Sequence, residues 1–398
     1  MAALTVAAGV LLALGVVYAA AIGAFAVGFM RVLRGERTRG RRGDLPFVSV
    51  IIPARDEAAS IEACLSSVFA NDCPPDRFEV IVVDDLSADD TPAVVRRLMP
   101  RWNPPGAPER LRLLQMPENL ERLRAHKKRA IEKGIEAARG SLILTTDADC
   151  FVPPGWIREM AACFEDADAD PGMKPVTAFV SGPVLFCSGD HPLLHMQALE
   201  FLGLVAAGAG AIGIGRPTIC NGANVAYRKD VFQALGGFRG IDHLTSGDDE
   251  LLMQKVAAET PHRVRFCAAP EAAVVTEPLR SLRAFFGQRR RWASKGAHYP
   301  SRPLVALLVG IYGFYFGLLV GVLAWPFVPA LGGPLLGAFA LKVLPEAALL
   351  GPACRHFGRA RLFAYFLPEQ VLHVPYIVVL GAAGAFGRYE WKGRRVVR

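Results

Sequence analysis

The sequence lacks several patterns that define common classes of protein. Its eight cysteines contain no C-x-x-C pair and are scattered along 398 residues, which excludes a small disulfide scaffold and favours reduced, mostly buried thiols. It has no internal repeat, and its 52% apolar content excludes a disordered chain. Charged residues make up only 21%, yet the net charge is +8. The basic residues lie in short runs beside apolar stretches, which indicates a membrane as partner and not nucleic acid.

Charge is absent from the whole N-terminal region. No charged residue precedes Arg31, so residues 3–30 are long enough to cross ~30 Å of hydrocarbon as a helix. A cleaved signal peptide would have its basic residues before the apolar run, whereas here six Arg follow it, in RVLRGERTRGRR (31–42). The positive-inside rule therefore predicts an integral membrane protein with this flank in the cytoplasm and the N-terminus outside.

Residues 44–300 have an ordinary composition and an alternating pattern. Runs rich in β-branched residues alternate with amphipathic stretches such as IEACLSSVFA (61–70) and LRAHKKRAIEKGIEAARG (123–140). The pattern predicts a cytosolic α/β domain with a mostly parallel sheet between helices and with functional loops at the carboxyl ends of the strands. The expected strands are FVSVIIPA (47–54), EVIVVDD (79–85), RLRLLQM (110–116) and SLILTTDAD (141–149).

Residues 303–387 are expected to form a C-terminal membrane region. No charge occurs between Arg302 and Lys342, and PFVPALGGP divides this stretch into two predicted spans, about 304–325 and 335–351. A third apolar segment, 362–387, contains Pro, Glu and His. If it also crossed, the basic tail 388–398 would lie outside, so we interpret it as re-entrant or interfacial and place the tail in the cytosol.

Acidic residues follow the first two predicted strands. Asp56 and Glu57 end the first strand, where acidic residues also simply favour the start of a helix. Asp84 and Asp85 end the second strand, and two buried carboxylates cost free energy unless they have a partner. A nucleoside could be that partner, since its base N–H and ribose hydroxyl groups donate hydrogen bonds.

Two further acidic motifs come later in the chain. Asp147 and Asp149 follow an apolar run and share one face of extended chain, where Mg²⁺ or Mn²⁺ would relieve their repulsion and bridge to a diphosphate; a surface turn is the alternative. Asp248 and Asp249 follow Ser246 in a pattern that resembles a capping box. A carboxylate at such a helix start can also act as a general base on a sugar hydroxyl.

The last motif is QRRRWASKG (288–296). On a helix, Gln288, Arg291 and Trp292 share a face, while Arg289 and Arg290 are expected to point elsewhere. Arg291 could hold a diphosphate with two hydrogen bonds, and Trp292 could stack on a sugar ring. Membrane topology alone would explain the arginines but does not require the Gln and Trp at this spacing.

Taken in order, these motifs resemble those of a known family. PARDEA, VDDLSADDT, a D-x-D, a late acidic pair and Q-x-x-R-W look like the membrane-bound inverting glycosyltransferases of family 2, which have a GT-A fold. The similarity covers about residues 47–295. Q-x-x-R-W is the most specific motif and is similar to the branch of cellulose, chitin and hyaluronan synthases and ceramide glucosyltransferases. Asp56 departs from the pattern, because many members have Asn there.

The resemblance implies a role for each matched position. Glu57 and Asp85, or Asp84 in its place, would contact the nucleoside, and Lys127 or Lys128 would lie near the diphosphate. Asp147 would bind donor phosphate or ribose, and Asp149 the metal. Asp249 would be the base, and Asp248, in place of the family's Glu, would bind the acceptor or sugar. Arg291 would bind the leaving diphosphate, while Asn221, in CNGANVAYR, would face the acceptor with Gln288 and Trp292, although a simple turn would also explain Asn221.

The implied activity is transfer of a sugar, with inversion, from a nucleotide-sugar (a UDP-sugar by resemblance) to an acceptor. Three or four membrane segments are few for exporting a polysaccharide, so we expect a lipid or membrane-held glycan acceptor. A processive short-chain polysaccharide synthase is the alternative, because Q-x-x-R-W is frequent in processive enzymes. A non-catalytic nucleotide-binding membrane scaffold is a distant alternative. The sequence specifies neither the sugar nor the oligomeric state.

Overall fold

The computed structural model describes residues 2–38, 45–117, 125–165, 175–187, 189–244, 247–293, 299, 301–386, 389–391 and 394–396. Ser246 of the expected capping box and residues 39–42 of the basic flank lie outside these ranges. The chain divides into two compact units. The sheet unit comprises Arg31–Cys187 and Gly215–Glu277, and the helical unit comprises Met1–Met30, Ser188–Ile214 and Pro278–Arg398.

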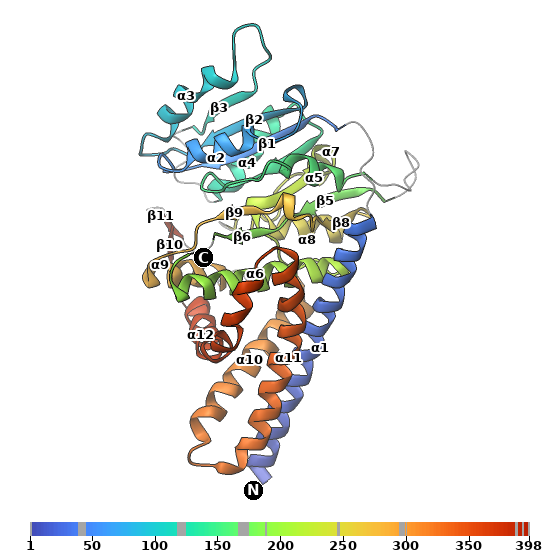
Figure 1. Ribbon diagram of the computed structural model, residues 1–398, viewed down its shortest axis with the longest axis vertical. Helices are drawn as coiled ribbons and strands as arrows, with labels where there is room; N and C mark the ends of the chain where they lie inside the picture. The colour runs from blue at the N-terminus through green and yellow to red at the C-terminus, as the bar shows by residue number, and fades with distance from the viewer. Residues whose placement is uncertain are drawn as a thin grey trace. The chain divides into compact units, whose positions relative to one another are not determined.

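The sheet unit is built on a mostly parallel sheet (Figure 1). Its strand order is β3-β2-β1-β4-β7-β5-β8, and only β7 runs against its neighbours on both sides. The strands are β1 (Val48–Ala54), β2 (Phe78–Asp84), β3 (Leu111–Gln115), β4 (Leu142–Thr145), β5 (Thr177–Ser181), β7 (Val225–Arg228) and β8 (Arg263–Phe266). A small parallel pair, β6 (Val184–Phe186) and β9 (Val274–Thr276), completes the unit. The predicted α/β fold is confirmed.

Helices cover this sheet and bring the loops to one edge. They are α2 (Ile61–Phe69), α3 (Thr91–Trp102), α4 (His126–Ala137), α5 (Trp156–Ala162), α7 (Lys229–Ala234) and α8 (Glu250–Glu259). The backbone of α4 lies close to β1, because a Cβ atom at Gly134 would be only 2.7 Å from Ile51 Cγ2. This close packing fixes the first turn of α4 beside the carboxyl ends of the strands.

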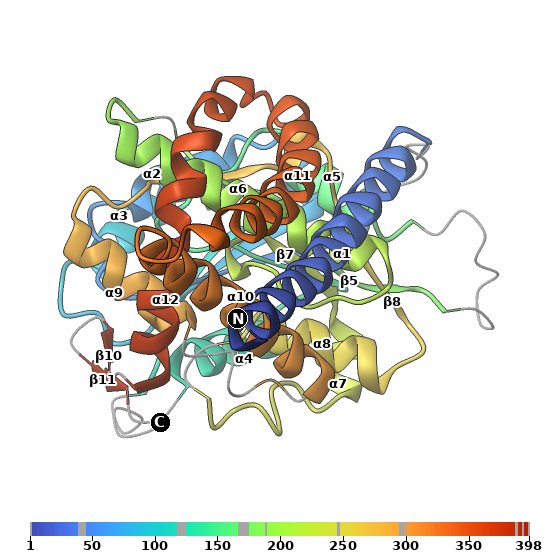
Figure 2. The ribbon, with the colours of Figure 1, turned by 90° about the horizontal axis from the view of Figure 1, so that it is seen from below.

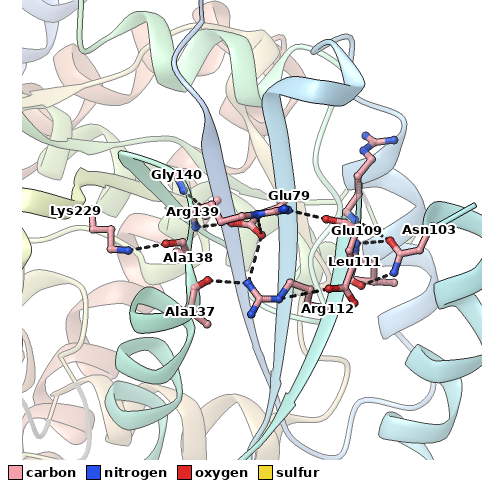
Figure 3. A network of polar contacts seen from close by, with 12 residues as sticks. Glu79, Asn103, Glu109, Leu111, Arg112, Ala137, Ala138, Arg139, Gly140 and Lys229 are labelled. Carbon is pink, nitrogen blue, oxygen red and sulfur yellow. Dashed lines mark hydrogen bonds and ion pairs between the residues drawn. The ribbon is translucent and has the colours of Figure 1, made fainter. Parts of the chain in front are cut away.

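A buried carboxylate joins the amino-terminal ends of β1 and β2 to the loop after α4 (Figure 3). Every residue of β2 is buried, including Glu79, so its charge needs partners inside the protein. Glu79 Oε1 accepts hydrogen bonds from Ser49 Oγ and from the backbone N–H of Arg139, both at 2.7 Å. The Arg139 and Arg112 guanidinium groups lie 2.9 and 3.6 Å from Oε2. The network therefore compensates the charge of Glu79.

Replacing Glu79 should destabilise the sheet unit. In Glu79→Ala the Ser49 hydroxyl and two arginines lose a buried partner, so we expect the free energy of unfolding to fall by roughly 3–5 kcal/mol. Glu109→Ala is the matched control, because Glu109 is exposed and lies 4.0 Å from the same Arg112; we expect a change within about 0.5 kcal/mol. Thermal unfolding in detergent measures both, and equal melting temperatures would contradict the prediction.

The helical unit contains long apolar helices. They are the N-terminal part of α1 (Ala2–Thr38), α6 (Pro192–Gly213), α10 (Arg302–Ala324), α11 (Gly332–His356) and α12 (Phe366–Phe386), with the shorter α9 (Leu282–Ala293) beside them. Figure 2 shows the N-terminal end of α1 next to α10, where Leu11 and Tyr18 share a core with Phe314 and Leu335. A Cβ at Gly28 would be only 2.0 Å from Gly210 O, so glycine is required where α1 meets α6.

Five helices in the described part of the chain are long and apolar enough to cross a membrane: Leu4–Glu36, Pro192–Gly213, Arg302–Ala324, Pro329–His356 and Ala360–Gly384. Two coincide with the predicted spans 304–325 and 335–351. Pro192–Gly213 was not identified from the sequence. This helix and residues 278–300 belong to the helical unit, although the sequence placed both in the 44–300 domain. The segment interpreted as re-entrant, 362–387, contains one continuous helix, α12.

Buried polar side chains connect four of these helices. Lys342 of α11 is fully buried, and its Nζ donates to Glu346 Oε2 at 3.1 Å and to Gln370 Oε1 of α12. Glu346 Oε1 accepts from the hydroxyls of Tyr18 on α1 at 2.5 Å and Tyr315 on α10 at 3.3 Å. Gln370 and the adjacent Glu369 of the third apolar segment are thus buried within the helical unit.

The Lys342 and Glu346 pair should show strong coupling. Lys342→Met leaves the Glu346 carboxylate buried without its cation, and we expect a loss of about 3–5 kcal/mol of stability. Lys342→Met combined with Glu346→Gln removes both charges and keeps an acceptor for the two tyrosines, so it should be less destabilised than the single variant. Melting temperatures in detergent test this; a double variant less stable than Lys342→Met would contradict it.

Candidate functional site

The loops after β1 and β2 interlock at the carboxyl edge of the sheet. The Glu57 backbone N–H donates to Thr91 Oγ1 at 2.8 Å, and its carboxylate accepts from Ser60 Oγ at 2.7 Å. Asp56 adopts a positive φ of 51° and accepts from the Ala88 N–H at 2.7 Å. Asp56 thus ties the two loops together, a contact that an Asn oxygen could make as well.

Asp84 and Asp85 are both buried but have different surroundings. Asp84 accepts from the Ser87 N–H at 3.4 Å within its own turn. Asp85 Oδ1 lies 3.4 Å from Nδ1 of His126, at the start of α4. Sequence reasoning missed His126, although it directly precedes the two lysines that were considered. Of the two aspartates left open by the sequence, Asp85 is the one that faces α4.

Lys127 joins two acidic motifs that are a hundred residues apart. Its Nζ lies 2.8 Å from Asp147 Oδ1, after β4, and 3.2 Å from Asp248 Oδ2, before α8. Burial opposes the charged ammonium, but the carboxylates of Asp147 and Asp248 outweigh this effect and raise the pKa of Lys127. Lys128 instead donates to the carbonyls of Ile241 and Leu244, at 2.5 and 2.8 Å. Lys127 is therefore the lysine that belongs to the acidic cluster.

Asp149 lies two residues after Asp147, in the turn that follows β4. The residue is exposed, yet partial desolvation of its carboxyl group, followed by the negative charges of Asp147 and Glu57, raises the pKa of Asp149 to about 6. Carboxylates that destabilise one another in this way would gain from a nearby cation.

Asp147 and Asp149 have the oxygen ligands that hard divalent cations prefer. The described residues hold no group of three or more His, Cys, Asp or Glu side chains suited to a metal ion. Mg²⁺ commonly takes one or two carboxylates and completes its shell with water and substrate phosphate. By donor chemistry the pair suits Mg²⁺ or Mn²⁺ accompanied by a phosphate ligand. The extended chain expected at these residues is not found, because the Cys150 N–H donates to the Asp147 carbonyl at 3.2 Å and closes a turn.

Asp249 caps helix α8. Its Oδ1 accepts from the Glu250 N–H and its Oδ2 from the Gly222 N–H, both at 2.8 Å. A Cβ at Gly222 would lie 3.1 Å from Asp248 Oδ2 and 3.3 Å from Lys127 Nζ, so glycine allows the chain to approach the acidic cluster closely. Asn221 accepts from the Ala223 N–H at 3.0 Å and so caps a short 3-10 helix. The turn interpretation thus accounts for the contact of the Asn221 side chain.

The Q-x-x-R-W motif lies on α9, in the helical unit. Gln288, Arg291 and Trp292 are half-buried there, and Trp292 packs against Phe201 of α6. The expectation that Arg289 points away from the motif is wrong, because its guanidinium carbon lies 4.2 Å from the centre of the Trp292 ring. The spacing from 289 to 292 also brings side chains together on a helix, and the sequence reasoning did not use it.

The chain matches two families of glycosyl transferases. Residues 49–173 match Glycosyl transferase family 2, and residues 142–367 match Glycosyl transferase family group 2. The chain is 27% identical over 209 residues to the glycosyltransferase AglE of Haloferax volcanii, a match that covers 52% of this chain and 59% of AglE. It is 36% identical over 112 residues to an undecaprenyl-phosphate 4-deoxy-4-formamido-L-arabinose transferase of Aeromonas hydrophila, covering 28% of this chain and 31% of that one.

A solved structure is similar over almost the whole chain. It is the mannosyltransferase PcManGT of Pyrobaculum calidifontis in complex with GDP-mannose and Mn²⁺, with a TM-score of 0.51 and 23% identity, covering 94% of this chain and 98% of that one. This likeness supports the GT-A fold. Because one family match alone spans more than half of the 398 residues, the chain belongs to Glycosyl transferase family group 2.

Proposed function

We propose that this protein transfers a hexosyl group, with inversion, from a nucleotide-sugar to a lipid or membrane-held acceptor. The observation that carries the proposal is the contact of Lys127 with both Asp147 and Asp248. This contact brings two groups together. Asp147 is suited to a metal ion and the donor phosphate, and the turn that contains Asp248 and Asp249 is suited to deprotonating an acceptor. A non-catalytic scaffold would have no use for this arrangement, and membership of a glycosyltransferase family argues against it.

The donor would bind across the carboxyl ends of β1, β2 and β4. Glu57 and Asp85 would accept hydrogen bonds from the nucleoside, with His126 fixing the Asp85 carboxylate. Lys127 would attract the diphosphate. When bound at Asp147 and Asp149, Mg²⁺ or Mn²⁺ would neutralise charge on the diphosphate oxygens.

Asp249 is the proposed base. Asp248 instead forms an ion pair with Lys127, whose Nζ lies 3.2 Å from its Oδ2. Two backbone N–H groups, those of Glu250 and Gly222, fix the orientation of the Asp249 carboxylate. The acceptor hydroxyl would give its proton to Asp249 while its oxygen bonds to the anomeric carbon. The bond from that carbon to the diphosphate breaks, and the nucleoside diphosphate leaves with the electron pair.

A lipid acceptor suits the apolar helices and the relatives. The relative from Aeromonas hydrophila is named as an undecaprenyl-phosphate transferase, and a β-monoglucosyldiacylglycerol synthase of Nostoc is 25% identical over 124 residues. We propose that the sheet unit faces the cytosol, where nucleotide-sugars are made, and that Gln288, Trp292 and Asn221 face the acceptor. Arg291 remains the proposed partner of the leaving diphosphate. The processive alternative rests on Q-x-x-R-W.

The test combines candidate donors with candidate acceptors. Detergent-purified protein is incubated with UDP- and GDP-sugars, Mn²⁺ or Mg²⁺, and undecaprenyl phosphate, diacylglycerol or native polar lipid extract. We expect mass spectrometry of the organic phase to show one product, heavier by one or a few hexosyl units. A long ladder of sugar units would favour the processive synthase. No transfer from any donor, combined with no metal-dependent nucleotide binding, would reject the proposal.

Asp149→Ala should abolish metal-dependent donor binding while leaving the fold intact. The substitution removes one of two carboxylates proposed to hold the ion, and most of the metal affinity should go with it. Isothermal titration with UDP or GDP, with and without Mn²⁺, measures the effect, and Asp76→Ala is an exposed control. If Asp149→Ala binds nucleotide like the unmodified protein in both conditions, Asp149 is not part of the site.

Asp249→Asn and Asp248→Asn separate catalysis from capping. If Asp249 is the base, its amide variant cannot take a proton, and turnover should fall by about 10² or more while nucleotide binding persists. Because Oδ2 accepts from Gly222, the amide also loses one hydrogen bond, and we expect about 1 kcal/mol of lost stability. Asp248→Asn should act mildly. Inactive Asp248→Asn beside active Asp249→Asn would move the base by one residue, and near-full rates in both would reject this mechanism.

A further inference from the structure

A carboxylate of α6 joins three helices of the helical unit. Glu200 Oε2 lies 2.7 Å from Nη2 of Arg289 on α9, and Oε1 accepts from the hydroxyl of Tyr376 on α12, also at 2.7 Å. Arg289 is only 4% exposed and the Glu200 side chain 13%. Both carboxylate oxygens therefore have a specific partner away from bulk water.

Arg289 in turn contacts two residues of the Q-x-x-R-W motif. Its Nη1 donates to Gln288 Oε1 at 3.2 Å, and its guanidinium carbon lies 4.2 Å from the Trp292 ring centre. Phe201 also packs against this ring, with 5.7 Å between the two ring centres. The Trp292 ring thus contacts both a cation and an aromatic ring, and the Gln288 carbonyl oxygen is turned toward the same cation.

Tyr376 extends the chain of contacts into the buried network of the apolar helices. Its ring stacks on His373 with 5.8 Å between centres, and His373 Nδ1 lies 3.4 Å from the Tyr315 hydroxyl. Tyr315 donates to Glu346, the partner of Lys342. The orientation of α9 therefore depends on how α10, α11 and α12 pack against one another.

We propose that Glu200 and Arg289 are positioning residues that hold Trp292 and Gln288 in the orientation used to bind the acceptor, an inference that rests on the proposed function. A planar guanidinium covers more of an indole ring than a compact lysine ammonium does, and its N–H groups point in fixed directions toward two acceptors. A buried ion pair contributes little net stability, because desolvation offsets most of its attraction. The geometry of this pair is thus better suited to orienting its neighbours than to strengthening the fold.

Arg289→Lys is the main test, since it keeps the positive charge but removes the guanidinium group that lies over the Trp292 ring. Arg283→Lys, an exposed arginine on the same helix, is the matched control. The protein is labelled with 5-fluorotryptophan, and Trp292→Phe identifies the Trp292 ¹⁹F resonance. We expect that resonance to shift or broaden in Arg289→Lys and in Glu200→Gln, and to stay unchanged in Arg283→Lys.

Kinetics provide the second readout, with native polar lipid extract in detergent micelles as the acceptor. In Arg289→Lys the acceptor KM should rise about tenfold, while the KM for the nucleotide-sugar and the melting temperature stay close to those of the unmodified protein. Trp292→Phe should raise the same acceptor KM.

Two outcomes would overturn the inference. One is a lower melting temperature with an unchanged Trp292 resonance and acceptor KM, which would make the pair a structural tie only. The other is an unchanged acceptor KM in Trp292→Phe. If Arg289→Lys does not fold, the same measurements on Glu200→Gln decide between these outcomes. If no donor is turned over, the proposed function fails, and an unchanged ¹⁹F resonance in both variants would then still reject the positioning role.

Discussion

The contact of Lys127 with Asp147 and Asp248 is the interaction on which the rest of the site depends. Parallel strands end at the same edge of a sheet, so the acidic residues that follow β1, β2 and β4 gather there and repel one another. A cation on the first turn of α4 relieves part of this repulsion, and Gly134 lets α4 approach β1 closely enough to deliver it. Burial and the remaining negative charge of Asp147 and Glu57 raise the pKa of Asp149, and a divalent metal ion would compensate both this negative charge and that of a diphosphate.

In the helical unit the buried charged groups lie among apolar side chains, where each needs its own partner. Glu200 and Glu346 each accept from a tyrosine and pair with a cation from another position in the helices. Apolar contacts between helices are tolerant of sliding, whereas a buried carboxylate with two fixed partners is not. Glu346 therefore specifies the register of α1, α10 and α11, and Glu200 that of α6, α9 and α12. The same physics that makes such groups costly makes them effective at fixing geometry.

The extent to which the sequence predicts this structure varies by element. The strands β1, β2 and β4 were predictable because continuous Val- and Ile-rich runs suit a sheet buried on both faces. Lys127 and Lys128 were indistinguishable. Successive residues of a helix point about 100° apart, and the sequence does not show which of the two lysines faces the ends of the strands. Helix α6 was missed because His195, Gln197 and Glu200 interrupt its apolar run. Glu200 is also the residue whose partners, 89 and 176 positions away, no local pattern reveals.

Capping and catalysis are compatible at Asp249. A cap needs a fixed acceptor oxygen, and a general base needs a carboxylate held in one orientation, so the N–H groups of Glu250 and Gly222 would serve both needs. Asp248 has a different partner, the Lys127 ammonium, which lies 3.2 Å from its Oδ2. Two adjacent carboxylates are thus held by different groups, one by backbone N–H groups and the other by an ion pair, and their position in the sequence alone does not reveal this difference.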